Sequence, residues 1–420
     1  MMTSPTANLE QEPSAIIRRH LQTIFREPAG RLRHPYVDPG GVYGKNLWDW
    51  DSFWSLKAAF GIDPNDEAWG RQVARHAAGV LENFFDHQGE DGSLPILMTP
   101  EDTDWFDSTS VKTNNMGKPV FGQLMLEVSR RHGDPAQLTR WCERLDAFYQ
   151  CFESRYRANC GLYVWANDIA IGSDDDPATW GRPPFSSANL LLNNLLFADL
   201  TSAAEVASRI GLSGLAQRWS AQAATLAAQI QDCCWDERDG FFYSVDVQCR
   251  QRTSPHRHFG TLNENLVPTW SSLPMKMLYW TGFLPMWSGI ATPAQAARLV
   301  EEHLLQEGQF WAPHGVRTMA ADERIYDPES SRGNPSNWLG PIWILPSYLI
   351  WDGLRRYGFY REAGELAHRI LALLAADLDQ NGHWHENYHP ETGKGLAAPG
   401  FVSWNALINF MLEPKDGRPS

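Results

Sequence analysis

Three consecutive acids, Asp174, Asp175 and Asp176, form the densest group of reactive side chains in the sequence. Adjacent like charges raise one another's pKa, which favours a protonated carboxyl near neutral pH. Pro177 follows the acids, and the Ser186-Ser187 pair resembles a helix N-cap, so we expect the acids on a loop at a helix entrance. A solvated loop is the plain alternative. D-D-D-P lacks the spaced oxygen ligands of an EF-hand calcium loop.

A second acid, Glu386, lies in the segment HWHENYHPETGKG (383–395), between His385 and an Asn-Tyr pair. His383 and His385 are two residues apart and would face opposite sides of a strand, so we expect neither a metal nor any other cofactor here. A surface loop is the alternative. Glu386 is 212 residues from Asp174, and only a closed fold could bring the two carboxyls together.

Two further segments surround polar groups with aromatic rings. LWDWDSFW (47–54) contains Trp48, Trp50 and Asp51, and SRGNPSNWLGPIWILPSY (331–348) contains Trp338 and Trp343. The chain has 19 Trp residues, and a flat apolar ring can stack on the C–H face of a sugar while acids accept hydrogen bonds from its hydroxyls. Trp as core filler and Asp as a helix cap are the alternatives. Glycoside hydrolysis needs two carboxylates beside such a pocket.

The composition limits both the class of ligand and the cellular location that we expect. A net charge of −14 argues against nucleic acid and anionic membranes as partners, and an anionic substrate would need local donors. The six cysteines form no C-x-x-C pair, the N-terminus has no secretory pattern, and no run of 18 apolar residues occurs. We therefore expect a cytoplasmic protein with reduced thiols, a small-molecule partner and, as an open possibility, a homo-oligomer.

The elements that must position these residues are helical. Apolar residues recur every three or four positions, and adjacent segments are joined by few residues, which indicates antiparallel helical hairpins. Six hairpins closed in a ring predict an all-α fold, an (α/α)6 barrel, in a single domain over 1–420 with loose tails at 1–13 and 414–420. A β-like piece is expected at 240–247. The predicted helices cover 14–27, 50–62, 66–87, 117–132, 135–156, 186–211, 213–235, 272–282, 293–305, 340–357, 359–378 and 400–412.

From Tyr36 to Phe410 the sequence resembles glycoside hydrolase family 63, and within it the short bacterial members that hydrolyse mannosylglycerate and glucosylglycerate. The resemblance is carried by PYVDPGG (35–41), LWDWDSFW (47–54), KPVFGQ (118–123), IGSDDDP (171–177), GFLPMWSGIAT (282–292), NWLGPIW (337–343) and ENYHPETG (386–393). It implies an inverting mechanism with Asp174 as general acid and Glu386 as general base. It also implies a pocket that contains Tyr36, Trp48, Trp50, Asp51, Gln123, Trp338, Gly340 and Trp343.

Arg182, together with Asn337 and Tyr388 from the last two motifs, completes the predicted substrate-binding set. Tyr36, Tyr43 and Arg182 are expected to close over a small group. The favoured hypothesis is hydrolysis of a small α-glycoside to free sugar plus glycerate. Three alternatives stay open: a trehalase- or α-glucosidase-like enzyme on a neutral disaccharide, a sugar epimerase or isomerase that uses His383 and His385, and a non-catalytic sugar-binding protein.

Overall fold

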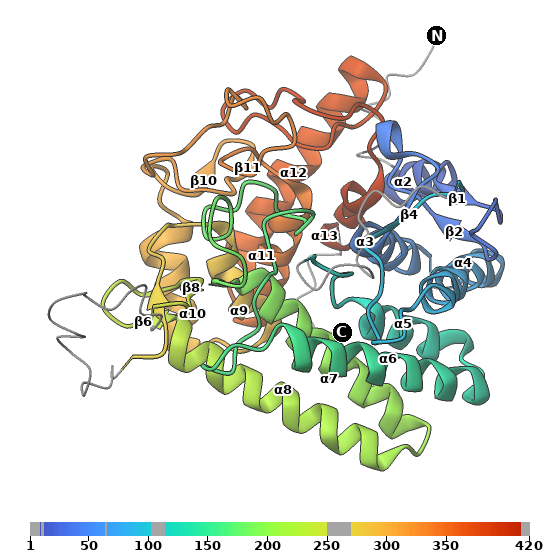
Figure 1. Cartoon of the computed structure of the whole chain (residues 1–420). Coiled ribbons are helices and arrows are strands. Elements are labelled where there is room, and N and C mark those ends of the chain that lie inside the picture. The colour runs from blue at the N-terminus through green and yellow to red at the C-terminus, as the bar shows by residue number, and fades with distance from the viewer. Residues whose placement is uncertain (1–8, 10–11, 64, 102–113, 250–269, 413–420) are drawn as a thin grey trace, which may run out of the picture.

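The computed structural model describes residues 9, 12–63, 65–101, 114–249 and 270–412, and its core is a closed ring of helices. In Figure 1 the chain passes around this ring in order, from blue through green and yellow to red. Each inner element packs on the next, and the last packs against the first, which closes the ring. The inner elements are α3 (Asp49–Phe60), α5 (Phe121–His132), α7 (Leu190–Arg209), α9 (Leu284–Ser288), α11 (Ile344–Arg356), and η4 (Ser403–Leu407) continued by α13 (Ile408–Met411).

A second set of helices covers the ring from outside. The outer elements are α2 (Pro13–Gln22), α4 (Glu67–Asp86), α6 (Pro135–Arg155), α8 (Ser213–Cys234), α10 (Pro293–Arg298) continued by the π-helix η3 (Leu299–Leu304), and α12 (Tyr360–Asn381). Eleven of the twelve residues of α3 are buried, as expected for a helix with neighbours on all sides. The outer α8 instead buries six of its 22 residues, in a stripe at three- and four-residue spacing. The (α/α)6 prediction is confirmed.

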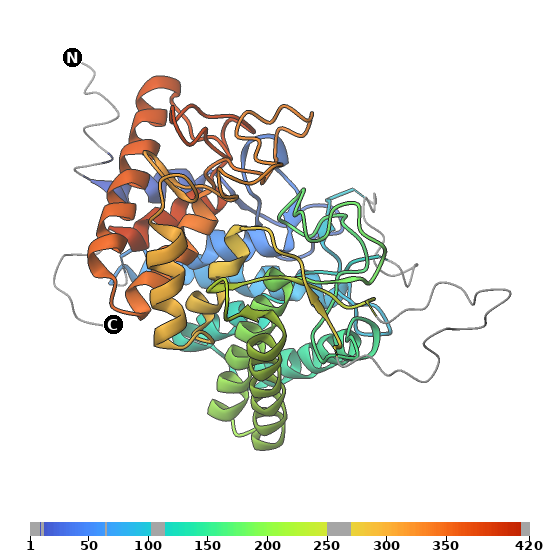
Figure 2. The same ribbon diagram turned by 90° about the vertical axis from the view of Figure 1, so that its left-hand side faces the viewer.

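The hairpin of α7 and α8 shows how an inner helix pairs with an outer one. The two helices pack side by side along their length, and Figure 2 shows them in green, projecting beyond the other helices. Their connection is short, from the end of α7 at Arg209 to the start of α8 at Ser213, and Gly211 in it has a φ of +81°. A glycine adopts this left-handed conformation readily, so the chain can reverse within three residues.

Several predicted boundaries are wrong, and Pro or Gly explains two of them. The helix predicted at 272–282 is largely absent: Pro274 lies in a strand, η2 (Trp280–Phe283) is a 3-10 turn, and α9 begins only beside Pro285. The helix predicted from 340 begins at Ile344, because Gly340 has a φ of +141°. The helix predicted from 186 begins at Leu190, and its cap is Asn189 rather than the Ser186-Ser187 pair. The predicted tails lie almost entirely outside the described residues.

Short antiparallel strands line the loops between helices. The β-like piece predicted at 240–247 is confirmed as β7 (Phe241–Phe242) and β8 (Val245–Asp246). β8 lies between its two neighbours in a three-stranded sheet, with Ser187 opposite Asp246 and Val245 opposite Pro274. The other strands form pairs: β1 (Phe25–Arg26) with β2 (Tyr36–Val37), β3 (Leu47–Trp48) with β4 (Leu97–Met98), β6 (Trp235–Asp236) with β7, and β10 (Trp311–Ala312) with β11 (Gly315–Val316); β5 (Ser187–Ala188) and β9 (Leu273–Pro274) flank β8.

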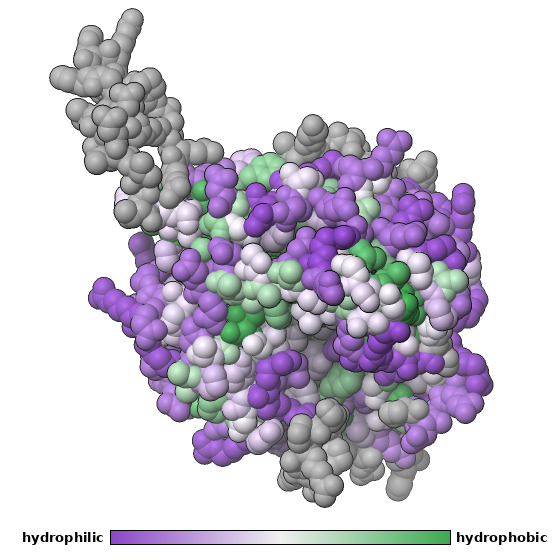
Figure 3. All heavy atoms as spheres, turned by 90° about the horizontal axis from the view of Figure 1, so that it is seen from below, coloured by the Kyte–Doolittle hydropathy of each residue, from purple (hydrophilic) through white to green (hydrophobic). Residues whose placement is uncertain are grey.

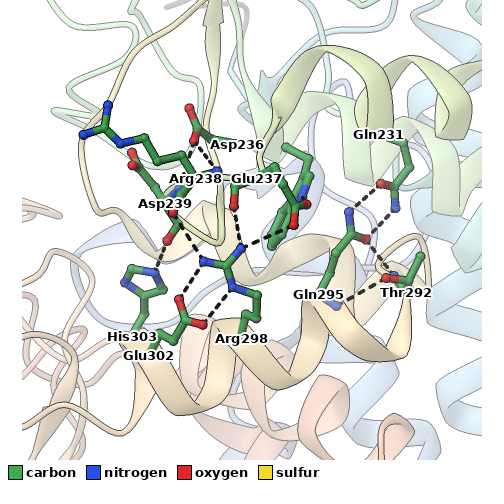
Figure 4. Close-up of polar contacts among 11 residues, drawn as sticks. Gln231, Asp236, Glu237, Arg238, Asp239, Thr292, Gln295, Arg298, Glu302 and His303 are labelled. Atoms are coloured by element: carbon green, nitrogen blue, oxygen red, sulfur yellow. Dashed lines mark hydrogen bonds and ion pairs between the residues drawn. The ribbon is translucent and has the colours of Figure 1, made fainter.

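Figure 4 shows how the outer α10 is fixed to the turn between β6 and β7. Arg298 donates from Nη1 to the carbonyl oxygen of Glu237 at 2.6 Å, and its Nε pairs with Glu302 Oε1 at 2.7 Å. His303 Nε2 lies 2.9 Å from the carbonyl oxygen of Asp239. Gly240 has a φ of +67°, and a Cβ there would lie 2.6 Å from the Arg298 guanidinium. The turn and the helix therefore hold one another in place.

No helix of the described residues is long and apolar enough to cross a membrane. On the face seen from below the view of Figure 1, apolar side chains form small patches separated by hydrophilic ones (Figure 3).

One close backbone approach positions the segment that reaches the site. Gly79 of α4 lies against Pro35, and a Cβ at Gly79 would come within 2.0 Å of the Pro35 carbonyl oxygen. Pro35 leads into β2 and then into η1 (Gly41–Tyr43), which ends at the Tyr43 side chain. The absence of a side chain at position 79 thus lets this segment lie directly on α4.

We predict that Gly79→Ala destabilises the protein by about 1–3 kcal/mol, the usual cost of overpacking a well-packed site. Gly70, in the same helix, is the matched control, because a Cβ there meets nothing within 4 Å. Gly70→Ala should be neutral or stabilise by up to about 1 kcal/mol, because Ala is the better helix former. Urea unfolding of both variants measures the difference, and equal effects would contradict the close approach.

Candidate active site

A cavity of about 440 Å³ opens among the loops that connect the helices. It combines carboxyl groups, one lysine and a group of indole rings. Its lining comes from six separate stretches of the chain, which the ring of helices brings together. The lining residues are Pro39, Tyr43, Trp48, Trp50, Asp51, Lys118, Asp168, Ile169, Ala170, Gly172, Asp174, Asp175, Trp180, Asn334, Ser336, Trp338, Trp343, Glu386 and Trp404.

The three consecutive acids have three different surroundings. Asp176 is buried, and its carboxyl accepts hydrogen bonds from Asn189 Nδ2 at 2.7 Å and from the backbone N–H of Ala178 at 2.8 Å. Asp175 has a φ of +59° and accepts a hydrogen bond from Asn334 Nδ2 at 2.9 Å. Asp174 lines the cavity, and no described residue donates a hydrogen bond to its carboxyl. Asp174 and Asp175 both line the cavity, and of these two only the Asp174 carboxyl has no hydrogen-bond donor among the described residues.

The residues before Asp174 anchor its loop to the core. The buried Ser173 Oγ lies 2.6 Å from Tyr279 Oη and accepts a hydrogen bond from Trp280 Nε1 at 3.2 Å. Gly172 has a φ of +93°, and a Cβ there would lie 2.6 Å from the Trp50 ring and 2.7 Å from Lys118 Cε. The acid loop can approach these two cavity residues only because position 172 has no side chain.

Glu386 is held at one of its two carboxyl oxygens. Ser336 Oγ donates to Oε2 at 2.7 Å, and Tyr43 Oη donates to the same oxygen at 3.2 Å. No described residue donates to Oε1. Hydrogen bonds to a carboxylate stabilise its charged form, so this arrangement suits a group that accepts a proton through its free oxygen.

The loop that carries Glu386 is fixed by Asp377 of α12. His385 donates to Asp377 from its backbone N at 2.9 Å, and its Nδ1 lies 3.0 Å from Asp377 Oδ1. Tyr388 Oη donates to Asp377 Oδ2 at 2.8 Å, and the Tyr388 backbone pairs with Ile342. His385 and Tyr388 therefore hold the Glu386 loop in place through their contacts with Asp377, and neither residue lines the cavity.

Four tryptophans form a buried aromatic group at the cavity. The rings of Trp338 and Trp343 stack, with centroids 3.9 Å apart and planes 14° apart. Trp404 packs edge-on to Trp50, with centroids 5.5 Å apart. Trp404 Nε1 is buried and has no partner among the described residues. A donor of this kind at the wall of a polar cavity is suited to a ligand oxygen.

A buried ion pair lies beside these rings. Lys118 Nζ contacts both carboxyl oxygens of Asp49, at 3.0 and 3.1 Å, and the Lys118 backbone N–H donates to Asp49 Oδ2 at 2.7 Å. Lys118 Nζ also lies 5.4 Å from the centroid of the Trp50 ring. This ion pair neutralises the charge of Asp49 beside the cavity. The neighbouring Asp51 has no ion-pair partner among the described residues.

Burial raises the pKa of each acid that faces the cavity interior. The pKa of Asp51 rises to about 8, through burial and then the charge of Asp49. The pKa of Asp174 rises to about 6, through burial and then the charge of Asp175. The pKa of Glu386 rises to about 7 through burial, opposed by hydrogen bonds from Ser336 and Tyr43. The charge of Asp174 also contributes to the raised pKa of Glu386.

The structure places seven of the predicted site residues at the cavity and six outside it. Those at the cavity are Trp48, Trp50, Asp51, Asp174, Trp338, Trp343 and Glu386. Those outside it are Tyr36, Gln123, Arg182, Asn337, Gly340 and Tyr388, and each makes a contact within the protein. The Tyr36 hydroxyl donates to the Lys45 carbonyl, the Gln123 backbone N–H donates to Asp199, and Arg182 pairs with Asp246. The Asn337 carbonyl accepts a hydrogen bond from Trp343 Nε1, and the Gly340 N–H donates to Thr318.

Sequence reasoning missed several side chains at the cavity, among them Lys118, Trp404 and Ser336. Lys118 lies in KPVFGQ (118–123), which carries the family resemblance. A lysine between apolar residues also indicates a buried ion-pair partner, and the partner here is Asp49. Trp404 reads as core, since it lies among apolar residues. Ser336 carries no signal of its own, because nothing in the sequence shows that its loop meets Glu386.

An (α/α)6 barrel with two buried carboxyls in an aromatic cavity defines a glycoside-hydrolase type of protein. Comparison with known families agrees: the model of the "Mannosylglycerate hydrolase MGH1-like glycoside hydrolase domain" matches residues 45–404. The chain belongs to this family. The resemblance to glycoside hydrolase family 63 is thereby confirmed.

Individual relatives are more distant. The chain is 26% identical over 359 residues to a probable mannosyl-oligosaccharide glucosidase of Schizosaccharomyces pombe, an alignment that covers 80% of this chain and 39% of the relative. It is 28% identical over 178 residues to the mannosylglycerate hydrolase of Thermus thermophilus, over 42% of this chain and 34% of the relative. These alignments span well under half of each relative.

The fold similarity covers much more of the chain. The crystal structure of a family 63 mannosylglycerate hydrolase from Thermus thermophilus, in complex with glucose, matches with a TM-score of 0.70 and 19% identity. The match covers 95% of this chain and 99% of the other, so the two proteins share the whole barrel.

We predict that Asp174→Asn stabilises the protein at alkaline pH. A carboxyl whose pKa is raised from 3.8 to about 6 on folding binds more protons in the native state, so stability falls as pH rises from about 4 to 6 and stays lowered above. Removing the charge should recover on the order of 1–3 kcal/mol at pH 8. Thermal unfolding at a series of pH values measures this gain, which should shrink as pH falls toward 4. A less stable variant at pH 8 would contradict the burial of the charge.

Proposed function

We propose that this protein is an inverting glycoside hydrolase with Asp174 as general acid and Glu386 as general base. The observation that carries the proposal is the presence of both carboxyls in one cavity, with Glu386 held at Oε2 and open at Oε1. In this class of reaction one carboxylic acid protonates the leaving oxygen while the other carboxylate activates a water molecule.

The roles follow from the hydrogen bonds of the two groups. The pKa values, about 7 for Glu386 and about 6 for Asp174, favour the proton on Glu386 in the free protein. Ser336 and Tyr43 hold Glu386 through Oε2 and act against the effect of burial on its pKa, whereas no described residue donates to the Asp174 carboxyl. A bound sugar completes this division, because the glycosidic oxygen accepts a proton and the attacking water gives one up.

The reaction then proceeds in one displacement. Glu386 Oε1 takes a proton from water, and the water oxygen attacks the anomeric carbon. The bond from that carbon to the glycosidic oxygen breaks as Asp174 transfers its proton to the leaving oxygen. Asp51, whose pKa is raised, supplies a polar group for the sugar, and Trp50 supplies a ring face. The products are a sugar of inverted anomeric configuration and the free aglycone.

The family suggests the substrate. Glucosylglycerate or mannosylglycerate is the first candidate, because the matched family is described by mannosylglycerate hydrolysis. The glycerate carboxylate would need a local donor, and Asn334 can supply one, because its Nδ2 carries two N–H groups and one of them donates to Asp175.

A neutral disaccharide is the second candidate. The described lining contains five acids and one lysine, and that lysine is already paired with Asp49. The epimerase alternative has less support, because His385 is bound to Asp377 and His383 packs against His385, with ring centroids 5.0 Å apart.

We further propose a cytoplasmic location, since all six cysteines are free thiols. We also propose that the protein can form a homo-oligomer, which a measurement of its oligomeric state in solution would test.

The residue roles can be tested with two leaving groups. We predict that Asp174→Asn and Glu386→Gln each lower kcat at least ~10²-fold on a natural α-glycoside. On the α-glycosyl fluoride, whose leaving group needs no protonation, Asp174→Asn should regain much of its activity and Glu386→Gln should not. Asp175→Asn is the matched control, one residue away and able to keep its contact with Asn334, and it should lose far less. Loss in Asp175→Asn with activity retained in Asp174→Asn would move the acid by one position.

The stereochemistry can be tested directly. We predict that NMR of the first product formed from an α-linked substrate shows the β-anomer, because water attacks from the side opposite the leaving group. The substrate is chosen from a panel of glycosyl glycerates and neutral α-glucosides and α-mannosides. An α-anomer at early times would exclude the single displacement.

A further inference from the structure

Two cysteines outside the cavity, Cys160 and Cys233, lie against one another although they are 73 residues apart in the sequence. Cys160 belongs to the turn that follows α6, and Cys233 lies in the last turn of α8. The Cys233 thiol donates a hydrogen bond to the Cys160 sulfur. Both cysteines are free, and neither lines the cavity. The proposed hydrolysis therefore gives this pair no role.

The backbone holds the turn of Cys160 against α8 independently of the two thiols. The Gly161 N–H closes the turn by donating to the Ala158 carbonyl at 2.9 Å. Gly161 has a φ of +88°, and a Cβ there would lie 3.0 Å from Gln229 Cγ. Gln229 and Cys233 are four residues apart in α8, so they lie on the same face of that helix. The residue beside Cys160 thus contacts the face of α8 that carries Cys233.

The two sulfurs have unequal surroundings. Hydrogen bonds from the Cys233 thiol and from the Leu162 N–H lower the pKa of the Cys160 thiol, against the opposing effect of burial. The charge of Arg157 also lowers the pKa of Cys160. The contact with Cys160 and then burial raise the pKa of the Cys233 thiol. The thiolate is the reactive form of cysteine, so Cys160 is the member of the pair that attacks an oxidant first.

We propose that Cys160 and Cys233 form a modification site, a dithiol that hydrogen peroxide converts to a reversible disulfide between α8 and the turn after α6. The Cys160 thiolate attacks one peroxide oxygen, the O–O bond breaks, and the departing hydroxide takes a proton from solvent. The Cys233 sulfur then attacks the Cys160 sulfenic acid, the S–O bond breaks, and the hydroxyl leaves as water with the Cys233 proton. The two thiols lose two electrons, and the peroxide is reduced to water.

Access to the pair fits a small oxidant. Cys160 is 7% exposed and Cys233 is partly exposed, whereas the adjacent Cys234 is 2% exposed. A peroxide molecule is small enough to reach a sulfur that is covered to this extent, and a dithiol reductant can reach the disulfide from the side of Cys233. The site does not depend on the proposed function, because neither cysteine takes part in it.

The disulfide would join two segments that flank the loop of Asp174. After Cys160 the chain passes Trp165, whose N–H donates to the Ser187 carbonyl at 3.3 Å. After Cys233 it passes through β6 and β7 to β8, which pairs with β5 at Ser187. A link that closes a loop of this length restricts the unfolded chain, so the oxidised protein should melt several degrees above the reduced protein.

The experiment treats the reduced protein with a slight excess of hydrogen peroxide, blocks free thiols with iodoacetamide and maps the digested protein by mass spectrometry without a reductant. We expect the peptides of Cys160 and Cys233 to be linked, and dithiothreitol to separate them. In Cys233→Ser the sulfenic acid of Cys160 has no partner, and dimedone should trap it. In Cys160→Ser, Cys233 should give about tenfold less dimedone adduct, because less of it is thiolate. Cys249→Ser is the matched control, since Cys249 is also partly exposed, and it should leave the link unchanged.

The outcomes decide between this pair and ordinary thiols. Peroxide that leaves Cys160 unmodified in the folded wild-type protein overturns the site, and so does a link from Cys160 to Cys234 in place of Cys233. Equal dimedone adducts in Cys160→Ser and Cys233→Ser overturn the assignment of Cys160 as the attacking thiol. A Tm that does not rise on oxidation overturns the expected restraint. The wild-type map needs neither variant, so it tests the site even where a serine substitution prevents folding.

Discussion

The buried ion pair between Asp49 and Lys118 is the interaction on which the arrangement of the site depends. Asp49 is the first residue of α3, and it also accepts a hydrogen bond from the Trp50 N–H at 2.7 Å. Lys118 lies just before α5 and touches the position where Gly172 brings in the acid loop. One pair of charges thus joins two inner helices and the loop of Asp174. Removing one partner of such a pair leaves an uncompensated buried charge, which typically costs about 3–5 kcal/mol.

The same cavity concentrates groups that are unfavourable for folding. Asp51, Asp174 and Glu386 all have raised pKa values because water is largely excluded around them. Asp175 adopts a left-handed backbone conformation, which costs on the order of 1–3 kcal/mol outside glycine. The surrounding barrel offsets these costs through buried helices such as α3. The strain and the buried charge lie where a reaction would use them, as is common at active sites.

The sequence predicted the barrel better than the site, and the reason is physical. Helical periodicity is set by burial, so the long helices were found even where their ends were misplaced by Gly340 or by a cap at Asn189. A short motif, in contrast, mixes residues that face a ligand with residues that hold them. Asn337 and Trp343 belong to one motif, yet Asn337 fixes the Trp343 indole and only Trp343 lines the cavity. Contacts between distant segments, such as Ser336 with Glu386, leave no pattern in the sequence.

The loops of Asp174 and Glu386, the proposed acid and base, are joined through a third segment that belongs to neither motif. Asn334 donates to Asp175, beside the acid, and two residues later Ser336 donates to Glu386. Asn387, beside the base, donates to the Pro335 carbonyl at 3.2 Å. The segment 334–336 therefore touches both catalytic loops at once. In the proposed reaction the room for an attacking water depends on the separation of the two carboxyls, so this short stretch helps to hold the loops on which that room depends.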